Sequence, residues 1–330
     1  MRRSKLPANW GFAVVGLSLF SALMFSGQVA SASSGHGPAP KVLDQALTHR
    51  IPLPQIMKFI STLAWLNRIN TFRLSSGLQP ITENPEWSAG AAAHARYNVN
   101  TSTLLPYEDA LSPYYTPDGN LAANFSLQLG QTSDSYTDLQ AVDFWMRSPF
   151  QALSILDPQW NTTGYGSYRS ASGGVYHMSG VLDVVRGFDP APPVAYPVYW
   201  PGAGSTINLK TYSGSDNPDP LQFPNCANVR GLPIILQVGL GSSSVSLTTQ
   251  TPTILRINGS PINHCAFSES EFTIPSDADA TEAGRLLLNQ RDAIVMIPTD
   301  PLVNGAYSVT VTVLVDNVQR TFNWSFTVVN

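Results

Sequence analysis

The segment 137–166 constrains the fold of this chain more than any other, because the ends of a helix can be read directly from its residues. Thr137 and Gln140 have the spacing of a capping box, which satisfies unpaired backbone donors at a helix start. Pro149 disfavours helical geometry in the residue before it and ends the helix. Between these limits, apolar side chains recur at helical spacing: Val142, Trp145 and Met146. The segment predicts one helix with a buried face, a second short helix and, after an Asp-Pro turn, a strand entered at Gly164.

The residues around this segment predict two earlier helices and a small sheet. Apolar residues at helical spacing run from Leu53 to a stop at Gly77, where glycine suits the left-handed position after a helix. A second helix begins at Asn84, which is followed by proline and an acid. Residues 100–136 are rich in turn formers and are predicted to form one long loop, which in a compact domain is usually functional. Strands are predicted over 164–168 and 174–184, so this part of the chain is expected to be α+β, with the form of an α-β-α sandwich.

The ends and boundaries of the domains are predicted from composition. A basic start, a short apolar core and the pattern Ala30-Ser31-Ala32 indicate a secretory signal peptide; an uncleaved membrane anchor is the alternative. The proline-rich run that begins at Asp189 indicates a stiff linker that would space two domains. The predicted order is a signal peptide (1–32), a flexible N-terminal segment (33–52), the α-β-α domain (53–188), the linker (189–200) and a β domain (201–330).

In the range 201–330 the pattern changes to short strand-like segments separated by turn clusters. The last two segments flank Asp316-Asn317 and predict a hairpin. Several such strands favour an all-β sandwich of immunoglobulin-like (Ig-like) architecture, although the Cys-Trp-Cys spacing of antibody domains is absent. The acidic run 277–282 lacks the glycine and the final acid of a calcium loop and is interpreted as a solvated turn. Cys226 and Cys265 are expected to form a disulfide; a zinc site that includes the adjacent His264 is the alternative.

Charge and motifs narrow the classes of function. A formal net charge of −4 without a basic cluster argues against nucleic acid as a partner. The sequence contains no Gly-x-Ser-x-Gly elbow, no His-Glu-x-x-His helix and no phosphate-binding loop. His177 is the best candidate for acid–base chemistry, although no acid or second histidine stands at a spacing that would orient it. His94 shares a helix face with Trp87 and is interpreted as a core or cleft-edge residue, and Glu108 lies in the long loop.

Three segments in a fixed order carry a resemblance to a known family. They read L-N-R-I-N-T-F-R-L-S-S-G-L-Q-P-I (66–81), A-A-A-H-A-R-Y (91–97) and F-W-M-R-S-P-F-Q-A-L-S-I-L-D-P (144–158). In order and spacing the chain resembles the CAP superfamily, which contains cysteine-rich secretory proteins, antigen-5 proteins, pathogenesis-related proteins of plants and secreted bacterial relatives. The resemblance covers residues 56–185 and implies an α-β-α sandwich with a central cleft.

In many members of this family the cleft holds two histidines and two glutamates that can bind a divalent metal. Near the first histidine position this chain has Glu108 and the residues before it, and Asn124 is what remains of a Gly-Glu-Asn motif. Ser148 stands where a glutamate is expected and Gln151 where bacterial relatives have a histidine. His177 lies in the strand that carries the family's second histidine. Because the carboxylates that would neutralise a cation are missing, neither a metal nor another cofactor is expected.

The resemblance implies a secreted protein, extracellular or at the cell surface, that binds instead of catalysing. Family members have been linked to sterol or lipid binding and to interactions with other proteins. A lipid, another small apolar ligand, or a cell-surface or extracellular protein is therefore expected as partner, with no stable membrane span after signal cleavage. The expected cleft is lined by His177, Gln151, Asn124, Ser148, Glu108 and His94. One alternative is an extracellular hydrolase of peptide or cell-wall material that uses His177 with Glu108; another is a structural surface protein whose β domain carries the function.

Overall fold

The structure is a computed structural model of the full chain, and it describes residues 63–189, 195–248 and 252–330. The signal peptide, the flexible N-terminal segment and the start of the helix expected from Leu53 lie outside the described residues. Residues 63–189 are called here the N-terminal region, and 195–330 the C-terminal region. No helix in the part of the chain that the structure describes is long and apolar enough to cross a membrane.

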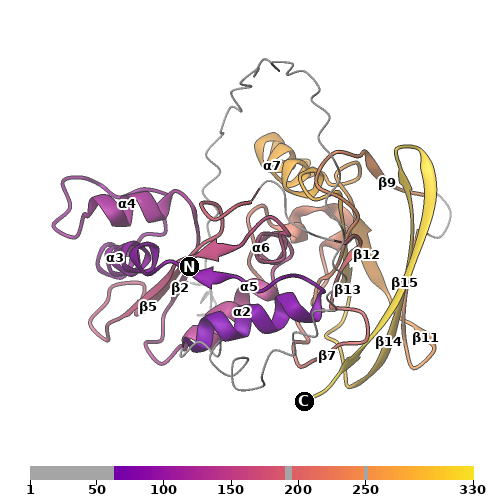
Figure 1. The fold of residues 1–330 in the computed structure, drawn as a ribbon, viewed down its shortest axis with the longest axis horizontal. Helices are drawn as coiled ribbons and strands as arrows, with labels where there is room; N and C mark the ends of the chain where they lie inside the picture. The colour runs from indigo at the N-terminus through magenta and orange to yellow at the C-terminus, as the bar shows by residue number, and fades with distance from the viewer. Residues whose placement is uncertain (1–62, 190–194, 249–251) are drawn as a thin grey trace, which may run out of the picture. The chain divides into compact units, whose positions relative to one another are not determined.

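The N-terminal region is built on a sheet of three strands with helices on both faces (Figure 1). The strand order is β2-β5-β4, and β5 is antiparallel to both neighbours. Strands β1 and β3 form a separate parallel pair. In chain order the elements are α2 (Ala64–Ser75), β1 (Thr82–Glu83), α3 (Pro85–Thr101), α4 (Pro117–Ala123), β2 (Ser126–Gln131), α5 (Asp138–Met146), α6 (Pro149–Ile155), β3 (Thr162–Thr163), β4 (Tyr165–Arg169) and β5 (Met178–Asp183).

The helix ends lie where the local chemistry predicts them. Thr137 and Gln140 form a complete capping box at the start of α5. The Asn84 side chain accepts hydrogen bonds from the backbone N–H groups of Glu86 and Trp87 at the start of α3. Gly77 follows α2 with a φ of 79°, in the left-handed region that favours glycine. These caps are set by neighbouring residues, which is why the sequence alone indicates them.

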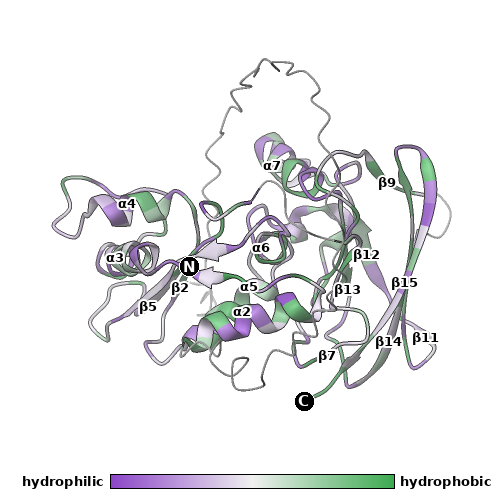
Figure 2. Cartoon of the chain, in the orientation of Figure 1, coloured by the Kyte–Doolittle hydropathy of each residue, from purple (hydrophilic) through white to green (hydrophobic). Residues whose placement is uncertain are grey.

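Strand alternation sends the side chains of the sheet to two different layers. On one face, Leu127 and Leu129 of β2 and Met178 of β5 belong to the same hydrophobic cluster as Trp145 of α5. On the other face, α3 packs on the sheet, and its residues Ala91 and Ala95 cluster with Val181 of β5. The α+β class and the α-β-α sandwich are confirmed. Figure 2 shows that α2 carries both apolar and polar positions, as a helix that covers one face of a sheet should.

The prediction of one continuous loop over 100–136 is wrong, because this range contains α4 and β2. Thr116 caps α4 by accepting a hydrogen bond from Gly119 N, and Pro117 occupies the first turn. Strand β2 is short and its sequence, S-L-Q-L-G-Q, contains glycine and polar residues. The many turn formers around these two short elements hide them from a periodicity argument.

The C-terminal region consists mainly of two sheets. One has the strand order β11-β10-β14-β15-β7, with β9 also paired to β14, and the other has the order β12-β13-β8-β6. The strands are β6 (Val198–Trp200), β7 (Thr206–Ile207), β8 (Ile234–Gln237), β9 (Val245–Leu247), β10 (Thr253–Ile257), β11 (Ser260–Pro261), β12 (His264–Phe267), β13 (Ala293–Pro298), β14 (Gly305–Val315) and β15 (Val318–Val328), with short 3-10 turns at Pro220–Gln222 and Pro224–Cys226. The hairpin predicted at Asp316-Asn317 joins β14 to β15 and places both residues at positive φ. The β-rich architecture is confirmed and is consistent with an Ig-like domain.

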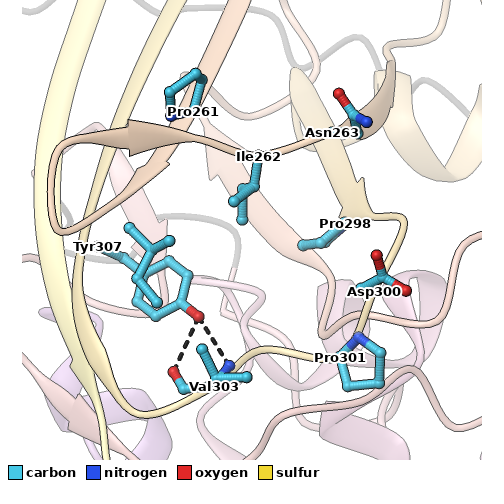
Figure 3. Close-up of a pocket in the computed structure, with 9 residues that line it drawn as sticks. Pro261, Ile262, Asn263, Pro298, Asp300, Pro301, Val303 and Tyr307 are labelled. Carbon is cyan, nitrogen blue, oxygen red and sulfur yellow. Dashed lines mark hydrogen bonds between the residues drawn. The ribbon is translucent and has the colours of Figure 1, made fainter.

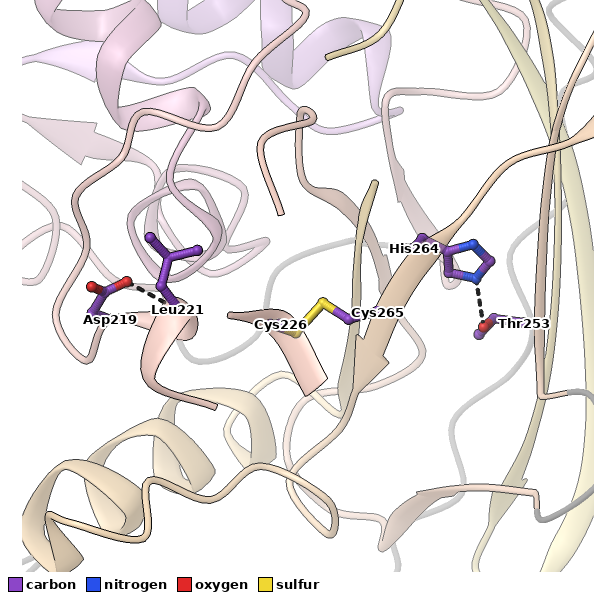
Figure 4. The surroundings of a disulfide bond; sticks show 6 residues. All are labelled: Asp219, Leu221, Cys226, Thr253, His264 and Cys265. Carbon is purple, nitrogen blue, oxygen red and sulfur yellow. Dashed lines mark hydrogen bonds between the residues drawn. A yellow bond between two sulfur atoms is a disulfide. The ribbon is translucent and has the colours of Figure 1, made fainter. Parts of the chain in front are cut away.

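Two details of the C-terminal region bear on the predictions. Cys226 and Cys265 form the expected disulfide, which ties the second 3-10 turn to β12 (Figure 4). His264 is not a ligand beside them: its Nε2 is hydrogen bonded to Thr253 Oγ1 at 2.8 Å. The expectation of an all-β domain misses the helix α7 (Ala278–Asn289). The acidic run interpreted as a solvated turn is the start of this helix, because the Asp277 side chain caps it by accepting a hydrogen bond from Ala280 N.

The two regions share one core instead of being held apart by the proline-rich segment. Side chains of both regions belong to a single hydrophobic cluster, and Phe150 of α6 contacts Phe267 of β12 with ring centroids 6.3 Å apart. A buried ion pair crosses the same boundary, with Arg291 Nη2 2.8 Å from Asp157 Oδ2. Residues 198–200, the end of the range predicted as linker, form β6 and pair with β8. The linker expectation rests on proline content, which does not reveal that an adjacent apolar triplet completes a sheet.

Candidate functional site

A buried polar network joins α3 to the central sheet. His94 and Asn98 are one helical turn apart on α3, and neither side chain is exposed. The His94 ring lies 2.9 Å from Glu108 Oε1 through Nδ1 and 3.0 Å from Gln128 Oε1 through Nε2. Asn98 Nδ2 donates to Gln128 Oε1 at 3.1 Å and to Ser179 Oγ at 3.2 Å. Strands β2 and β5 therefore each supply one polar side chain to the helix face that also holds His94.

The hydrogen bonds of Gln128 fix where the protons of His94 lie. The amide nitrogen of Gln128 donates to the carbonyl oxygens of Leu105 at 3.0 Å and Ala123 at 3.4 Å, so its Oε1 can only accept. His94 Nε2 must therefore carry a hydrogen. His94 Nδ1 faces a carboxylate oxygen, so one further proton lies between Nδ1 and Glu108. Since both ring nitrogens are engaged, His94 has no free lone pair with which to act as a general base.

Glu108 fastens the segment 104–121, which connects α3 to α4 and includes the start of α4. Its Oε2 accepts a hydrogen bond from Thr116 N at 2.8 Å, and its own backbone N–H donates to Asn120 Oδ1 at 2.8 Å. A Cβ at Gly119 would overlap Glu108 Oε1 and Thr116 Oγ1, so glycine leaves room for the carboxylate here. Asp109 N donates to Tyr97 OH at 2.9 Å. The side chain of Glu108 thus ties the segment to His94 of α3 and to Thr116 at the start of α4, and its backbone adds a bond to Asn120 within α4.

The segment 104–121 exposes apolar side chains on its outer surface. The exposed fractions are 38% for Leu105, 54% for Tyr107, 92% for Leu111 and 46% for Leu121. Because Leu111 is almost fully exposed, its side chain contributes no hydrophobic stabilisation to the folded chain. The segment contains acids but no lysine or arginine. The segment therefore carries four exposed apolar side chains and no positive charge of its own, and these four side chains are called here the 104–121 surface.

Two of the predicted cleft residues, His177 and Asn124, make no side-chain hydrogen bond to His94, Glu108, Gln128, Asn98 or Ser179 in the part of the chain that the structure describes. The half-buried His177 uses its backbone, donating from N to Gln131 O at 2.8 Å and accepting from Ser170 N at 2.9 Å. Its imidazole makes no hydrogen bond within the described residues, so the pairing of His177 with Glu108 is not formed. Asn124 ends α4 by donating to Asn120 O at 2.8 Å.

Ser148 immediately precedes α6 as its N-cap and Gln151 lies in the first turn of α6, which packs against the C-terminal region. Ser148 Oγ is 2.6 Å from Ser213 Oγ and 2.9 Å from Ser215 O. Gln151 is fully buried, and neither of its side-chain polar atoms has a hydrogen-bond partner in the described part of the chain. The six predicted cleft residues are thus divided between the network at α3, the ends of α4 and β2, and the boundary of the two regions.

Asp216 is a buried acid that lies against the start of α6, and sequence reasoning missed it. Its Oδ2 accepts from Phe150 N at 2.8 Å, and its Oδ1 accepts from Asn217 N at 2.9 Å. Burial raises the pKa of Asp216 well above the usual value for a carboxyl; the backbone hydrogen bonds oppose this shift, and the nearby charge of Asp219 adds to it. No sequence signal links this aspartate to a helix 66 residues earlier.

Gln128, Asn98 and Ser179 are the other members of the network that sequence reasoning missed. Only Asn98 leaves a signal, because it stands four residues after His94 and shares its helix face. Gln128 and Ser179 lie in short strands whose pairing brings them to one face. Among residues 63–189, 195–248 and 252–330, no group of three or more histidine, cysteine, aspartate or glutamate side chains is placed to hold a metal ion.

Comparison of the sequence with known protein families gives one match. Residues 66–182 match the model of the CAP family, described as the cysteine-rich secretory protein family. No curated protein matches the chain. The chain is similar to PcoC, a methionine-rich copper resistance protein from Escherichia coli, at 18% identity and a TM-score of 0.23, over 41% of this chain and 100% of that chain. It is also similar to CopC from Methylosinus trichosporium OB3b, at 15% identity and a TM-score of 0.23, over 41% and 93%. TM-scores this low support no inference about fold or function.

Proposed function

Residues 66–182 of this chain form a CAP domain, and from this premise we propose that the protein is secreted and binds an apolar, lipid-type partner without catalysing a reaction. CAP domains are typically extracellular. The Cys226–Cys265 disulfide suits an oxidising compartment, and the basic start with its apolar core suits export. These observations support secretion.

The burial of His94 and Glu108 carries the binding proposal. Both side chains have no exposed surface, and each contacts the other at 2.9 Å. A hydrolase needs a base within hydrogen-bond reach of a water or a substrate. Here both ring nitrogens of His94 are occupied by protein groups, and Glu108 is occupied by His94 and Thr116. The pair therefore supports a positioning role for the segment 104–121.

The 104–121 surface is the part of the CAP domain that we propose contacts the partner. Leu105, Tyr107, Leu111 and Leu121 would gain free energy by leaving water, at roughly 25 cal/mol for each Å² of apolar surface buried. Asp109 and Asp118 in the same segment would be repelled by an anionic membrane, and Arg96, which lies 5.6 Å from the Tyr114 ring centroid, offsets only one of these two charges. Charge therefore favours a neutral or zwitterionic lipid surface over an acidic one.

Co-sedimentation with phosphatidylcholine vesicles tests this proposal. The full chain is expected to sediment with the vesicles, and Leu111→Ser is expected to weaken binding about tenfold, because one leucine contributes about 1.5–3 kcal/mol when it is fully buried. Adding phosphatidylserine to the vesicles is expected to weaken binding further.

Leu74→Ser is the matched control, since Leu74 is 59% exposed on α2 and lies outside the segment 104–121. It should bind vesicles as the unmodified chain does. Equal losses of vesicle binding in Leu74→Ser and Leu111→Ser, or no binding by the unmodified chain, would contradict the proposal.

A further inference from the structure

A pocket of about 360 Å³ lies where the N-terminal region meets the C-terminal region. One wall comes from residues 136–147, which include α5, and the other comes from the stretch 208–211. The volume falls within the range of about 300–1,000 Å³ that is usual for small-molecule sites. The pocket shares no residue with the 104–121 surface.

Two arginines bridge the walls of this pocket. Arg147 donates from Nη1 to Thr211 Oγ1 at 3.1 Å and from Nε to Asp143 O at 3.3 Å. Arg68 of α2 donates from Nε to Asp143 Oδ1 at 2.7 Å and from Nη2 to Asn208 Oδ1 at 3.2 Å. Each arginine thus joins the N-terminal region to the C-terminal region. The polar groups of the pocket are therefore held in position by the protein itself.

These bonds determine which groups remain as donors. Because Thr211 Oγ1 accepts from Arg147, its hydroxyl hydrogen is available to a ligand. Because Asn208 Oδ1 accepts from an arginine, the Asn208 amide nitrogen keeps its hydrogens to donate. Lys210 donates to Asn330 Oδ1 at 3.1 Å, and its ammonium group carries further hydrogens. Arg147, Lys210 and Thr211 are all half-buried.

The pocket carries an excess of positive charge. In the part of the chain that the structure describes, Asp143 is the only acid that lines it, and this acid is paired with Arg68 at 2.7 Å. Arg147 and Lys210 also line the pocket, and neither forms an ion pair with a described residue. Two positive charges are therefore left without a counter-charge, in a chain whose formal net charge is −4.

The pocket of about 370 Å³ at Tyr307 in the C-terminal region has no such excess (Figure 3). Asp300 is the one charged residue that lines it among the described residues, and it is exposed and paired with Arg230. Figure 3 shows the hydroxyl of the buried Tyr307 bonded to Val303. The charges at this second pocket cancel, and its tyrosine hydroxyl is used within the protein.

We propose that the pocket at Arg147 and Lys210 binds a phosphate group, either as the free ion or as the monoester of a small organic molecule. A phosphate monoester carries about −1.5 to −2 charge at pH 7 and three strong acceptor oxygens. This charge matches the two cations, and the oxygens match the donors of Thr211 and Asn208. A guanidinium also binds phosphate oxygens in a bidentate manner. A carboxylate brings a single negative charge and would leave one cation unmatched.

Phosphorus NMR of inorganic phosphate and of phenyl phosphate, each titrated with the full chain, tests the proposal. Binding with a dissociation constant in the millimolar range or tighter is expected. Tighter binding of phenyl phosphate would assign the site to a monoester, and tighter binding of inorganic phosphate would assign it to the free ion. Sodium acetate at the same concentration as the phosphate should not displace it.

Lys210→Gln and Arg147→Gln are each expected to weaken phosphate binding at least about tenfold, because each removes a charged hydrogen-bond donor. Lys210→Gln keeps a side-chain donor for Asn330 and reports on binding even if Arg147→Gln loosens the boundary of the two regions. Asp143→Asn removes the negative charge of the pocket and should tighten phosphate binding. A purely structural role of these residues would not produce that gain.

Arg230→Gln is the control, because Arg230 is an exposed arginine of the C-terminal region that does not line this pocket. It should bind phosphate as the unmodified chain does. The proposal is overturned if neither phosphate compound binds, if acetate displaces phosphate at equal concentration, or if binding is unchanged in Lys210→Gln. An equal loss of binding in Arg230→Gln and Lys210→Gln would overturn it as well.

Discussion

Glu108 and Asp216 are both buried carboxylates, but they have different hydrogen-bond partners in the two regions that contain them. Glu108, in the N-terminal region, contacts an imidazole and one backbone N–H group. Asp216, in the C-terminal region, has backbone N–H groups as partners and a second acid, Asp219, nearby. The first acid belongs to a closed network that shares a proton. The second caps a helix of the other region, and burial raises its pKa. The boundary between the regions is therefore expected to respond to pH.

The largest effect is expected from breaking the ion pair that crosses this boundary. Asp157→Asn leaves the buried Arg291 guanidinium without its counter-charge, which should lower the free energy of unfolding by about 3–5 kcal/mol. Urea unfolding followed by both tryptophan fluorescence and circular dichroism measures this loss. Because the two regions share one hydrophobic cluster, both signals should shift together in a single transition.

Asp143→Asn is the control for this prediction, because the Arg68–Asp143 pair is about one quarter exposed on each side. Water screens such a pair, and its loss should cost about 1 kcal/mol or less. Similar losses in Asp143→Asn and Asp157→Asn, or a transition that splits into two, would show that the regions are not joined as described.

A smaller effect is expected from pH at Asp216. Its pKa is higher in the folded chain than in the unfolded chain, so the folded chain holds the proton more tightly. The associated stability is fully present below about pH 4, the unfolded value, and is lost as pH rises through the folded pKa, at up to about 1.4 kcal/mol for each pH unit. Asp216→Asn keeps an acceptor for Phe150 N and cannot ionise, so this contribution should vanish from its stability profile.

Urea midpoints measured from pH 4 upward compare Asp216→Asn with the unmodified chain. The difference in stability between the two should grow with pH in favour of the variant. A constant difference across the range would mean that Asp216 titrates in the folded chain as it does in the unfolded one.

Local chemistry explains which parts of the fold could be predicted from the sequence. The capping box at Thr137, the cap at Asn84 and the hairpin at Asp316-Asn317 each depend on residues a few positions apart, and all three are present. The missed helix α7 shows the limit, because its acidic start also resembles a solvated turn. An N-cap and a surface turn use the same residues, and only the buried leucines that follow distinguish them.

The candidate site was less predictable, because its contacts are distant in sequence. The helix face of His94 was visible, but Glu108 approaches it through a segment without periodicity. Gln128 and Ser179 meet Asn98 only through the pairing of β2 with β5. Family positions also misled: Ser148 and Gln151 lie at the boundary with the C-terminal region, whose packing on α6 no motif indicates.

The central claim is that His94 and Glu108 hold the 104–121 surface in place for binding. Amide hydrogen exchange of residues 104–121 in His94→Leu tests it most directly, with His177→Leu as control, since the His177 imidazole makes no hydrogen bond among the described residues. In His94→Leu, exchange in this segment should rise at least about tenfold through the loss of two buried hydrogen bonds, and binding to phosphatidylcholine vesicles should weaken in parallel. His177→Leu should change neither. Unchanged protection of 104–121 in His94→Leu, or loss of vesicle binding in His177→Leu, would contradict the account.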